Sequence, residues 1–104
     1  MDTLKNVLKE VFEKSPKIKE KAREFEVIEA WPKAVGERIH KHARAIRVLP
    51  DGTLVVRAEN SAWVHQLHYL QTQIIQKLNK QLGAPRVKQL RFMVGERQSD
   101  NNGK

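Results

Sequence analysis

Residues 53–83 have the sequence TLVVRAENSAWVHQLHYLQTQIIQKLNKQLG, in which an alternating segment is followed by a helical one. Apolar side chains alternate over residues 53–59, which predicts a strand with one buried face. Asn60 or Ser61 is suited to cap a helix, and an apolar stripe that advances by three and four residues then predicts one long helix ending at Gly83. The stripe consists of Trp63, Leu67, Leu70, Ile74 and Leu78.

A strand is also predicted on each side of this segment. Residues 43–49 alternate in the same way, and the Pro-Asp-Gly sequence at 50–52 supplies a tight turn, which predicts a hairpin. The third strand covers residues 87–94, because Pro85 prevents the preceding helix from restarting. The side chains expected to face the core are Ile46, Val48, Leu54, Val56, Leu90 and Phe92, with Ala58 and Val94 on the same side.

Residues 1–36 are predicted to form two amphipathic helices. Ser15 and Pro16 end the first helix and are equally suited to start the second, as N-cap and first-turn proline. Pro32 is expected to kink the second helix or to start a new short turn, and Gly36 to end it. The apolar positions at helical spacing are Leu4, Val7, Leu8, Val11 and Phe12 in the first helix and Ile18, Ala22, Phe25, Ile28, Trp31 and Val35 in the second.

These elements predict an α+β fold in the order helix-helix-strand-strand-helix-strand, with a three-stranded sheet covered on one face by helices. One domain is expected over residues 1–94, and the polar residues 95–104 are expected to form a disordered tail. Successive side chains of a strand point to opposite faces of the sheet. The uncovered face is therefore predicted to carry one arginine from each strand, namely Arg47, Arg57 and Arg91.

The charge distribution favours a polyanionic partner. The chain has 104 residues, with 20 Lys and Arg against 12 Asp and Glu, and its net charge is +8. No acidic residue lies between Glu59 and Glu96, and such a basic stretch is typical of proteins that contact nucleic acid. The basic residues of this stretch are Lys77, Lys80, Arg86, Lys88 and Arg91, and they are DNA-binding candidates together with Arg47 and Arg57.

Several other classes of protein are disfavoured by the sequence. There is no cysteine, no membrane-spanning run and no signal peptide, so a cytoplasmic protein without a membrane partner is expected. The serines do not lie in a nucleophile-elbow sequence, and no P-loop or GXXG motif is present. The histidines occur as His40 with His42 and His65 with His68, which could approach one another as metal ligands, although their spacing is not diagnostic of a metal site. We therefore assign no catalytic residue, metal, cofactor or small-molecule substrate.

One face of the predicted long helix is a candidate protein-contact surface. Tyr69 points away from the apolar stripe, and its neighbours on that face of the helix are polar and include no acidic residue. An aromatic side chain ringed by uncharged polar groups is typical of the core of an interface. The residues of this candidate surface are His65, Tyr69, Thr72, Gln73 and Gln76.

Taken together, these motifs make the sequence similar to the bacterial DciA family of helicase loaders. Two tryptophan elements, separated by a hairpin, are the most specific part of the resemblance. The matching residues are Trp31, Val35-Gly36, Ile39, Gly52-Thr53-Leu54-Val55-Val56, Ser61-Ala62-Trp63, Leu67, Leu70, Leu78-Asn79, Leu90-Arg91-Phe92 and Gly95. The resemblance implies a KH-like fold without the GXXG loop, and a domain that binds DNA and the replicative helicase DnaB without hydrolysing ATP.

The sequence thus predicts a non-enzymatic, DNA-binding adaptor that helps to load the replicative helicase DnaB during DNA replication. Its recognition of DNA is expected to be electrostatic and largely independent of base sequence. Two alternatives remain open at this point. The chain could be a KH-like RNA-binding protein, or a pure protein-interaction module whose charge meets an acidic partner.

Overall fold

The computed structural model describes residues 4, 6–10 and 15–95, and it confirms the α+β prediction. Residues 4 and 6–10 are helical, as expected for the first helix, whereas Val11 and Phe12 lie outside the described residues. The remaining elements, in chain order, are α2 (Pro16–Val35), α3 (Glu37–His40), β1 (Ala43–Val48), β2 (Thr53–Ala58), α4 (Ser61–Tyr69), α5 (Gln71–Leu82) and β3 (Gln89–Val94).

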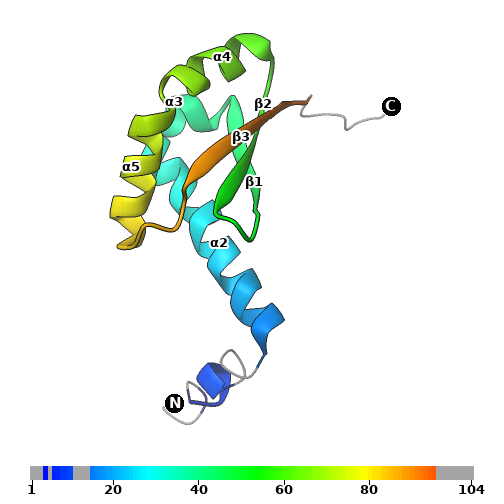
Figure 1. The fold of residues 1–104 in the computed structure, drawn as a ribbon, viewed down its shortest axis with the longest axis vertical. Helices are drawn as coiled ribbons and strands as arrows, with labels where there is room; N and C mark the ends of the chain where they lie inside the picture. The colour runs from blue at the N-terminus through cyan, green and yellow to red at the C-terminus, as the bar shows by residue number, and fades with distance from the viewer. Residues whose placement is uncertain (1–3, 5, 11–14, 96–104) are drawn as a thin grey trace.

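The sheet has the strand order β1-β2-β3, so the most apolar strand is central. β1 pairs with β2 antiparallel through the predicted hairpin, and β2 pairs with β3 parallel. A parallel pair needs a long crossover connection, which α4 and α5 provide. The helices α2 to α5 lie against one face of the sheet, as Figure 1 shows, and the other face is left uncovered. We call the uncovered side the open face.

The core lies between β2 and the helices. Leu54, Val56 and Ala58 alternate along β2 and are fully buried, as the sequence predicts. Trp31 of α2 is also fully buried, and its Nε1 donates a hydrogen bond of 3.0 Å to the Ala43 carbonyl of β1. This bond satisfies the polar atom of the largest buried side chain and ties α2 to the sheet.

The α2 helix begins and ends where the sequence predicts. The Ser15 side chain accepts a hydrogen bond from the Ile18 N–H, and Pro16 occupies the first turn. Pro32 lies inside the helix, which continues to Val35 and ends at Gly36. The amino-terminal half of α2 extends beyond the sheet (Figure 1). Of the apolar side chains predicted along α2, Phe25 is consequently 60% exposed.

The predicted single long helix is wrong, because it is divided at Leu70. Leu70 has φ −93° and ψ 6°, and its N–H is shared between the carbonyls of Gln66 and Leu67. The bend lets α4 cover the ends of β2 and β3 while α5 packs against α2. Gln71 fixes the start of α5 on the sheet, because its side-chain oxygen accepts the Leu90 N–H of β3 at 3.0 Å.

β3 ends at Val94 as predicted, but its start and the exposure of Val94 differ from the prediction. Val87 precedes the strand, and the Asn79 side chain bonds its N–H and its carbonyl, each at 2.9 Å. Val94 lies on the helix-facing side but is 55% exposed, because the strand extends beyond the helices. Gly95, the first residue of the tail predicted over residues 95–104, donates its N–H to the Ala58 carbonyl, and residues 96–104 lie outside the described residues. Among the helices that the structure describes, none is both long and apolar enough to cross a membrane.

Candidate nucleic-acid interface

The open face of the sheet carries two rows of arginines. Strand partners that lie directly opposite each other share a face of the sheet. Arg44 is the partner of Arg57, and we call these two arginines the distal row. Arg47 and Arg91 are both partners of Val55, and we call them the hairpin row because they lie nearer the β1-β2 turn.

All four arginines are exposed, and none forms an ion pair with a carboxylate among the described residues. Val55 is only 7% exposed although it faces outward. This burial is expected where the aliphatic stems of long side chains on both neighbouring strands cover a small residue. The predicted grouping of Arg47, Arg57 and Arg91 on one face therefore agrees with the strand register.

Arg44 was not predicted to lie on the open face, because β1 contains a bulge. The register shifts between Ala45 and Arg47, so that Ile46 has no strand partner of its own. Ile46 was expected to face the core, and this expectation is wrong: the side chain lines a hollow on the open face. The sequence does contain a signal for the bulge. Arg44 and Arg47 are three residues apart, so a regular strand would turn one of these two charged side chains toward the core.

The surroundings distinguish the two rows. Arg47 shares a hollow with Glu20, Lys21 and Glu24 of α2, so two carboxylates balance the two cations there. Glu24 itself accepts the Val48 N–H at 2.9 Å. The distal row instead borders a pocket that contains Lys41 as a third cation. The distal end of the sheet is therefore the more strongly basic part of the open face.

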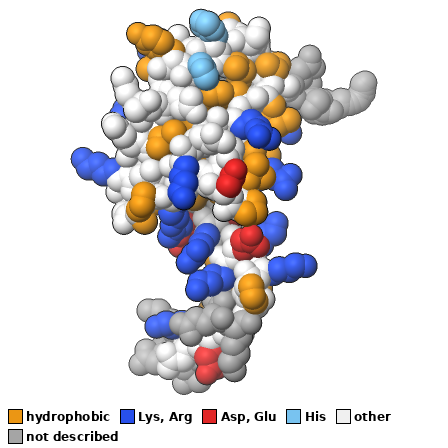
Figure 2. Space-filling model, in the orientation of Figure 1, with side chains coloured by type: hydrophobic (Ala, Val, Ile, Leu, Met, Phe, Trp, Pro, Cys, Tyr) orange, Lys and Arg blue, Asp and Glu red, His pale blue; other side chains and the backbone are white. Residues whose placement is uncertain are grey.

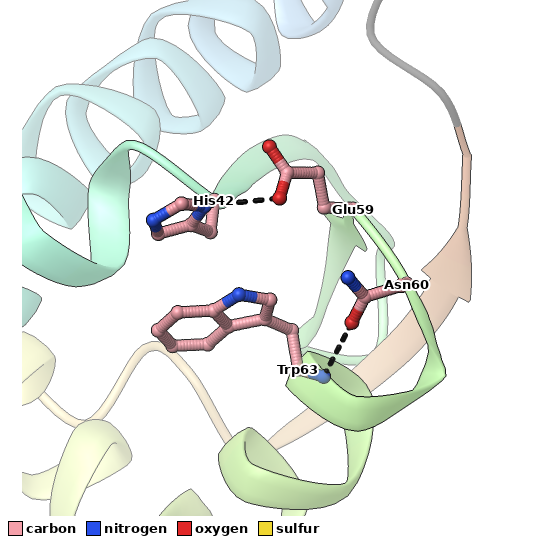
Figure 3. Close-up of polar contacts among 4 residues, drawn as sticks. All are labelled: His42, Glu59, Asn60 and Trp63. Atoms are coloured by element: carbon pink, nitrogen blue, oxygen red, sulfur yellow. Dashed lines mark hydrogen bonds and ion pairs between the residues drawn. The ribbon is translucent and has the colours of Figure 1, made fainter.

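Beside the distal row, His42 joins the sheet to α4 (Figure 3). Its Nδ1 lies 3.0 Å from a carboxylate oxygen of Glu59, and its ring stacks on Trp63 with 4.7 Å between the ring centroids and 14° between the planes. Asn60 caps α4, because its side-chain oxygen accepts the Trp63 N–H at 2.9 Å. The indole of Trp63 is half-buried, whereas the sequence predicted a core side chain.

The two histidine pairs contact different aromatic rings. The His42 ring stacks on Trp63. The His68 ring of α4 contacts Phe92 of β3 edge to face, with 6.2 Å between the ring centroids. Over the part of the chain that the structure describes, His, Asp and Glu side chains do not gather in a group of three that could hold a metal ion.

The other predicted DNA-binding residues lie away from the open face or are engaged in contacts. Lys77 and Lys80 line a shallow hollow with Lys33, between α5 and α2 on the helical side. Arg86 forms an ion pair with Glu26 of α2. The stem of Lys88 lies against Gly52 in the hairpin, where the glycine has a φ of 91°. The seven predicted basic residues thus do not form one surface.

The predicted protein-contact surface is exposed but follows a bend. His65 and Tyr69 belong to α4, whereas Thr72, Gln73 and Gln76 belong to α5. All five side chains are exposed, and Tyr69, at 83%, is the most exposed large apolar side chain among the residues that the structure describes. Figure 2 shows histidine and hydrophobic side chains gathered over α4 at the top of the view, with the acidic side chains lower down.

An apolar groove that the sequence did not predict runs beside this surface. It has a volume of about 490 Å³ and lies between α3 and α4. Ile39, Trp63 and Leu70 line it, and Arg38 and Gln66 are the polar side chains at its border. The groove depends on α3, and no element was predicted between Gly36 and the first strand.

Residues 3–92 match the family model described as Dna[CI] antecedent, DciA. The chain belongs to the DciA family. This membership confirms the resemblance inferred from the tryptophan elements, and it indicates a role related to DNA replication.

Curated proteins of two actinobacteria are similar to this DciA-family chain. A UPF0232 protein of Rhodococcus jostii is 41% identical over 78 residues, which cover 75% of this chain and 39% of the relative. A UPF0232 protein of Mycobacterium tuberculosis strain H37Rv is 38% identical over 66 residues, which cover 64% of this chain and 35% of the relative. The chain therefore spans about two fifths or less of the length of these relatives.

The structure gives the two DciA tryptophan elements different surroundings. Trp31 is buried between α2 and β1, and it stabilises the fold. Trp63 is half-buried at the border between the sheet, α4 and the apolar groove. Of the two elements, only the second therefore lies beside a surface that a partner can reach.

Proposed function

We propose that this chain is a non-enzymatic adaptor that binds DNA and the replicative helicase DnaB, and that it assists the loading of the helicase onto DNA. DNA lies on the open face of the sheet, and the helicase contacts the outer surface of α4 and α5. Membership of the DciA family supports the replication-related part of this proposal.

The observation that carries DNA binding is the presence of four exposed arginines on one open face. Two of them, Arg44 and Arg57, are direct strand partners. Like charges directly opposite each other destabilise a sheet, so an anion between them would relieve their repulsion. Arginine side chains also bind phosphate groups through two parallel hydrogen bonds.

The open face favours recognition of the nucleic-acid backbone. By the strand register its outward side chains are the four arginines with Thr53, Val55, Gln89 and Met93, together with Ile46 at the bulge, and none is an aromatic residue on which bases could stack. Contacts to phosphates position a protein on DNA but do not read its sequence. We therefore expect weak sequence preference and strong dependence on salt.

A salt series tests this part of the proposal. Fluorescence anisotropy with a labelled DNA should show affinity that falls steeply with salt, and Arg57→Gln should reduce the slope of log K against log salt by about one. Arg47→Gln should have a smaller effect, because Glu20 and Glu24 lie near that guanidinium. Arg23→Gln is the matched control, since Arg23 is an exposed arginine on α2.

The alternatives give different results in the same experiment. Tighter binding to an RNA of the same sequence would select the RNA-binding alternative. Failure to bind either nucleic acid at low salt would overturn the proposed DNA contact and leave a protein-interaction module. Lys77, Lys80, Arg86 and Lys88 become the candidates if the arginine variants bind DNA as well as the parent protein.

The helicase contact is proposed on chemical grounds. Tyr69 is an exposed aromatic side chain, and the other four side chains of this surface are polar and exposed, with no Asp, Glu, Lys or Arg among them. Aromatic anchors with a polar rim are typical of the residues that dominate binding energy in protein interfaces. An adaptor without a nucleotide-driven motor acts through differential affinity for two states of its partner, which requires such a selective contact.

A further inference from the structure

The distal end of the open face is hollowed into a pocket of about 330 Å³. Arg44 and Arg57, which are direct strand partners, line it from the sheet, and Lys41 lines it from the segment after α3. Ile46, which the bulge turns outward, gives the pocket an apolar wall. This volume is in the range of pockets that hold one small ligand.

The pocket carries an excess of positive charge. Three cations line it against one carboxylate, that of Glu59, which leaves a net charge of +2 when His42 is neutral. Glu59 is oriented toward His42, with 3.0 Å between its oxygen and Nδ1. A phosphate monoester carries a charge of about −1.5 to −2 at pH 7, whereas each phosphodiester of a nucleic acid carries only one negative charge.

Gly95 gives Arg57 its position at the wall of the pocket. A Cβ atom at residue 95 would lie 2.9 Å from Cδ of Arg57 and 3.1 Å from its Nε. Real Cβ atoms essentially never approach another atom within 3.0 Å, so the flexible Arg57 side chain would have to shift a little if residue 95 had a side chain. The Arg57 stem therefore lies directly over the glycine backbone.

We propose that this pocket binds the phosphorylated end of a nucleic-acid strand, with the terminal phosphate between Arg44, Arg57 and Lys41. The proposal rests on the proposed DNA contact of the open face and specifies where a strand ends on it. Ile46 contacts the sugar or base of the terminal nucleotide. Residues two apart along β2 are separated by about 6.6 Å, so the hairpin row lies roughly one nucleotide further along for the next phosphate.

The test compares two oligonucleotides that differ only at one end. Short oligothymidylates with a fluorophore at the 3′ end and either a phosphate or a hydroxyl at the 5′ end are titrated with the protein at equal ionic strength. A second pair carries the label at the 5′ end and varies the 3′ end. We expect one phosphorylated end to bind about tenfold more tightly than the matching hydroxyl, the size of one additional charged contact.

Variants show whether the pocket causes this preference. Arg44→Gln should abolish the difference in affinity between phosphorylated and hydroxyl ends, and Gly95→Ala, which makes Arg57 shift, should reduce it. Arg47→Gln should lower the affinity for both oligonucleotides and keep the ratio of the two affinities. Arg23→Gln, on α2, should change neither the affinity nor the ratio. Thermal unfolding of each variant distinguishes a lost contact from a lost fold.

Two results would overturn the inference. Equal, salt-dependent binding of phosphorylated and hydroxyl ends would leave the DNA contact intact but remove the end-binding pocket, whereas failure to bind any of the four would remove the DNA contact itself. Thymidine 5′-monophosphate serves as a competitor, and we expect it to compete weakly because it lacks the next phosphate. Competition equal to that of the oligonucleotide would assign the pocket to free nucleotides instead.

Discussion

How deeply a side chain is buried in this molecule depends on the elements that pack over it. Trp31 and Trp63 occupy similar positions in apolar helical stripes, and the sequence predicts core packing for both. Trp31 is fully buried and its Nε1 has a buried acceptor, the Ala43 carbonyl. Trp63 is half-buried, because its outer surface meets His42 and the groove beside α3. Helical spacing predicts which side faces inward but not how completely a neighbouring element covers it.

Substituting the two tryptophans should therefore have unequal effects on stability. Trp31→Ala is expected to lower the free energy of unfolding by about 3 to 5 kcal/mol, because it leaves a large cavity and an unpaired carbonyl. Trp63→Ala should lower the free energy of unfolding clearly less than Trp31→Ala, since part of the Trp63 ring is already in contact with solvent. Urea denaturation of both variants measures the difference. Equal losses would show that Trp63 is as deeply packed as Trp31.

A carboxylate in the hairpin predicts a specific dependence on pH. The pKa of Asp51 is lowered from its ordinary 3.8, chiefly by hydrogen bonds from the Thr53 side chain and from the Thr53 backbone, with Arg91 as a weaker cause. A lowered pKa means that the ionised form is favoured in the folded state. Its stabilising effect is complete above pH 3.8 and is lost as the pH falls through the lowered value.

A carboxyl titration followed by NMR should show the Asp51 pKa below 3.8 in the folded protein. Thr53→Val removes the hydroxyl donor and should raise the Asp51 pKa toward its ordinary value, while the buried side chain keeps its size. A titration at the ordinary value in the parent protein would contradict the hydrogen bonds at this turn.

At the scale of the elements, local patterns predicted the strands well and the helices less completely. Alternation located β1 and β2, and the Pro-Asp-Gly turn joined them, because both signals are contained in a few neighbouring residues. The division at Leu70 has no glycine or proline to mark it. It depends on contacts between distant segments, in particular the Gln71 side chain with the Leu90 N–H, and single-residue patterns do not contain such contacts.

In the candidate site, too, the local pattern of the sequence predicted some features and missed others. Parity along regular strands was sufficient to group Arg47, Arg57 and Arg91. It failed for Arg44, because the bulge at Ile46 changes the parity within β1. It also could not separate the basic residues of the helical side from those of the sheet, since charge along the sequence carries no information about which face a residue occupies.

The contact between Gln71 and β3 can be tested directly. Gln71→Ala should lower the free energy of unfolding by about 1 kcal/mol, because the partly buried Leu90 N–H loses its acceptor. The Leu90 amide should also exchange its hydrogen faster than in the parent protein. Gln73→Ala is the control, since Gln73 is exposed on the same helix. Unchanged exchange at Leu90 would show that Gln71 does not hold α5 on the sheet.

At the scale of the whole molecule, the two proposed surfaces belong to different layers. The arginines lie on the open face of the sheet, and Tyr69 lies at the end of α4 in the helical layer that covers the other face (Figure 1). DNA and helicase would therefore occupy separate surfaces. A protein with this arrangement can hold both partners at once, which is what placing a helicase on DNA requires of an adaptor.

Separate surfaces predict that the two bindings can be lost independently. Tyr69→Ala should weaken binding to the purified helicase DnaB by more than tenfold, about 1.4 kcal/mol, while DNA affinity and melting temperature stay unchanged. The double variant Arg44→Gln, Arg57→Gln should show the reverse pattern, because neither arginine lies on the helical layer. Titration calorimetry with the helicase and anisotropy with DNA measure the two affinities on the same protein samples. A Tyr69→Ala protein that retains full helicase affinity would exclude the surface of α4 and α5, and a variant that loses both bindings together would show that DNA and helicase share one surface.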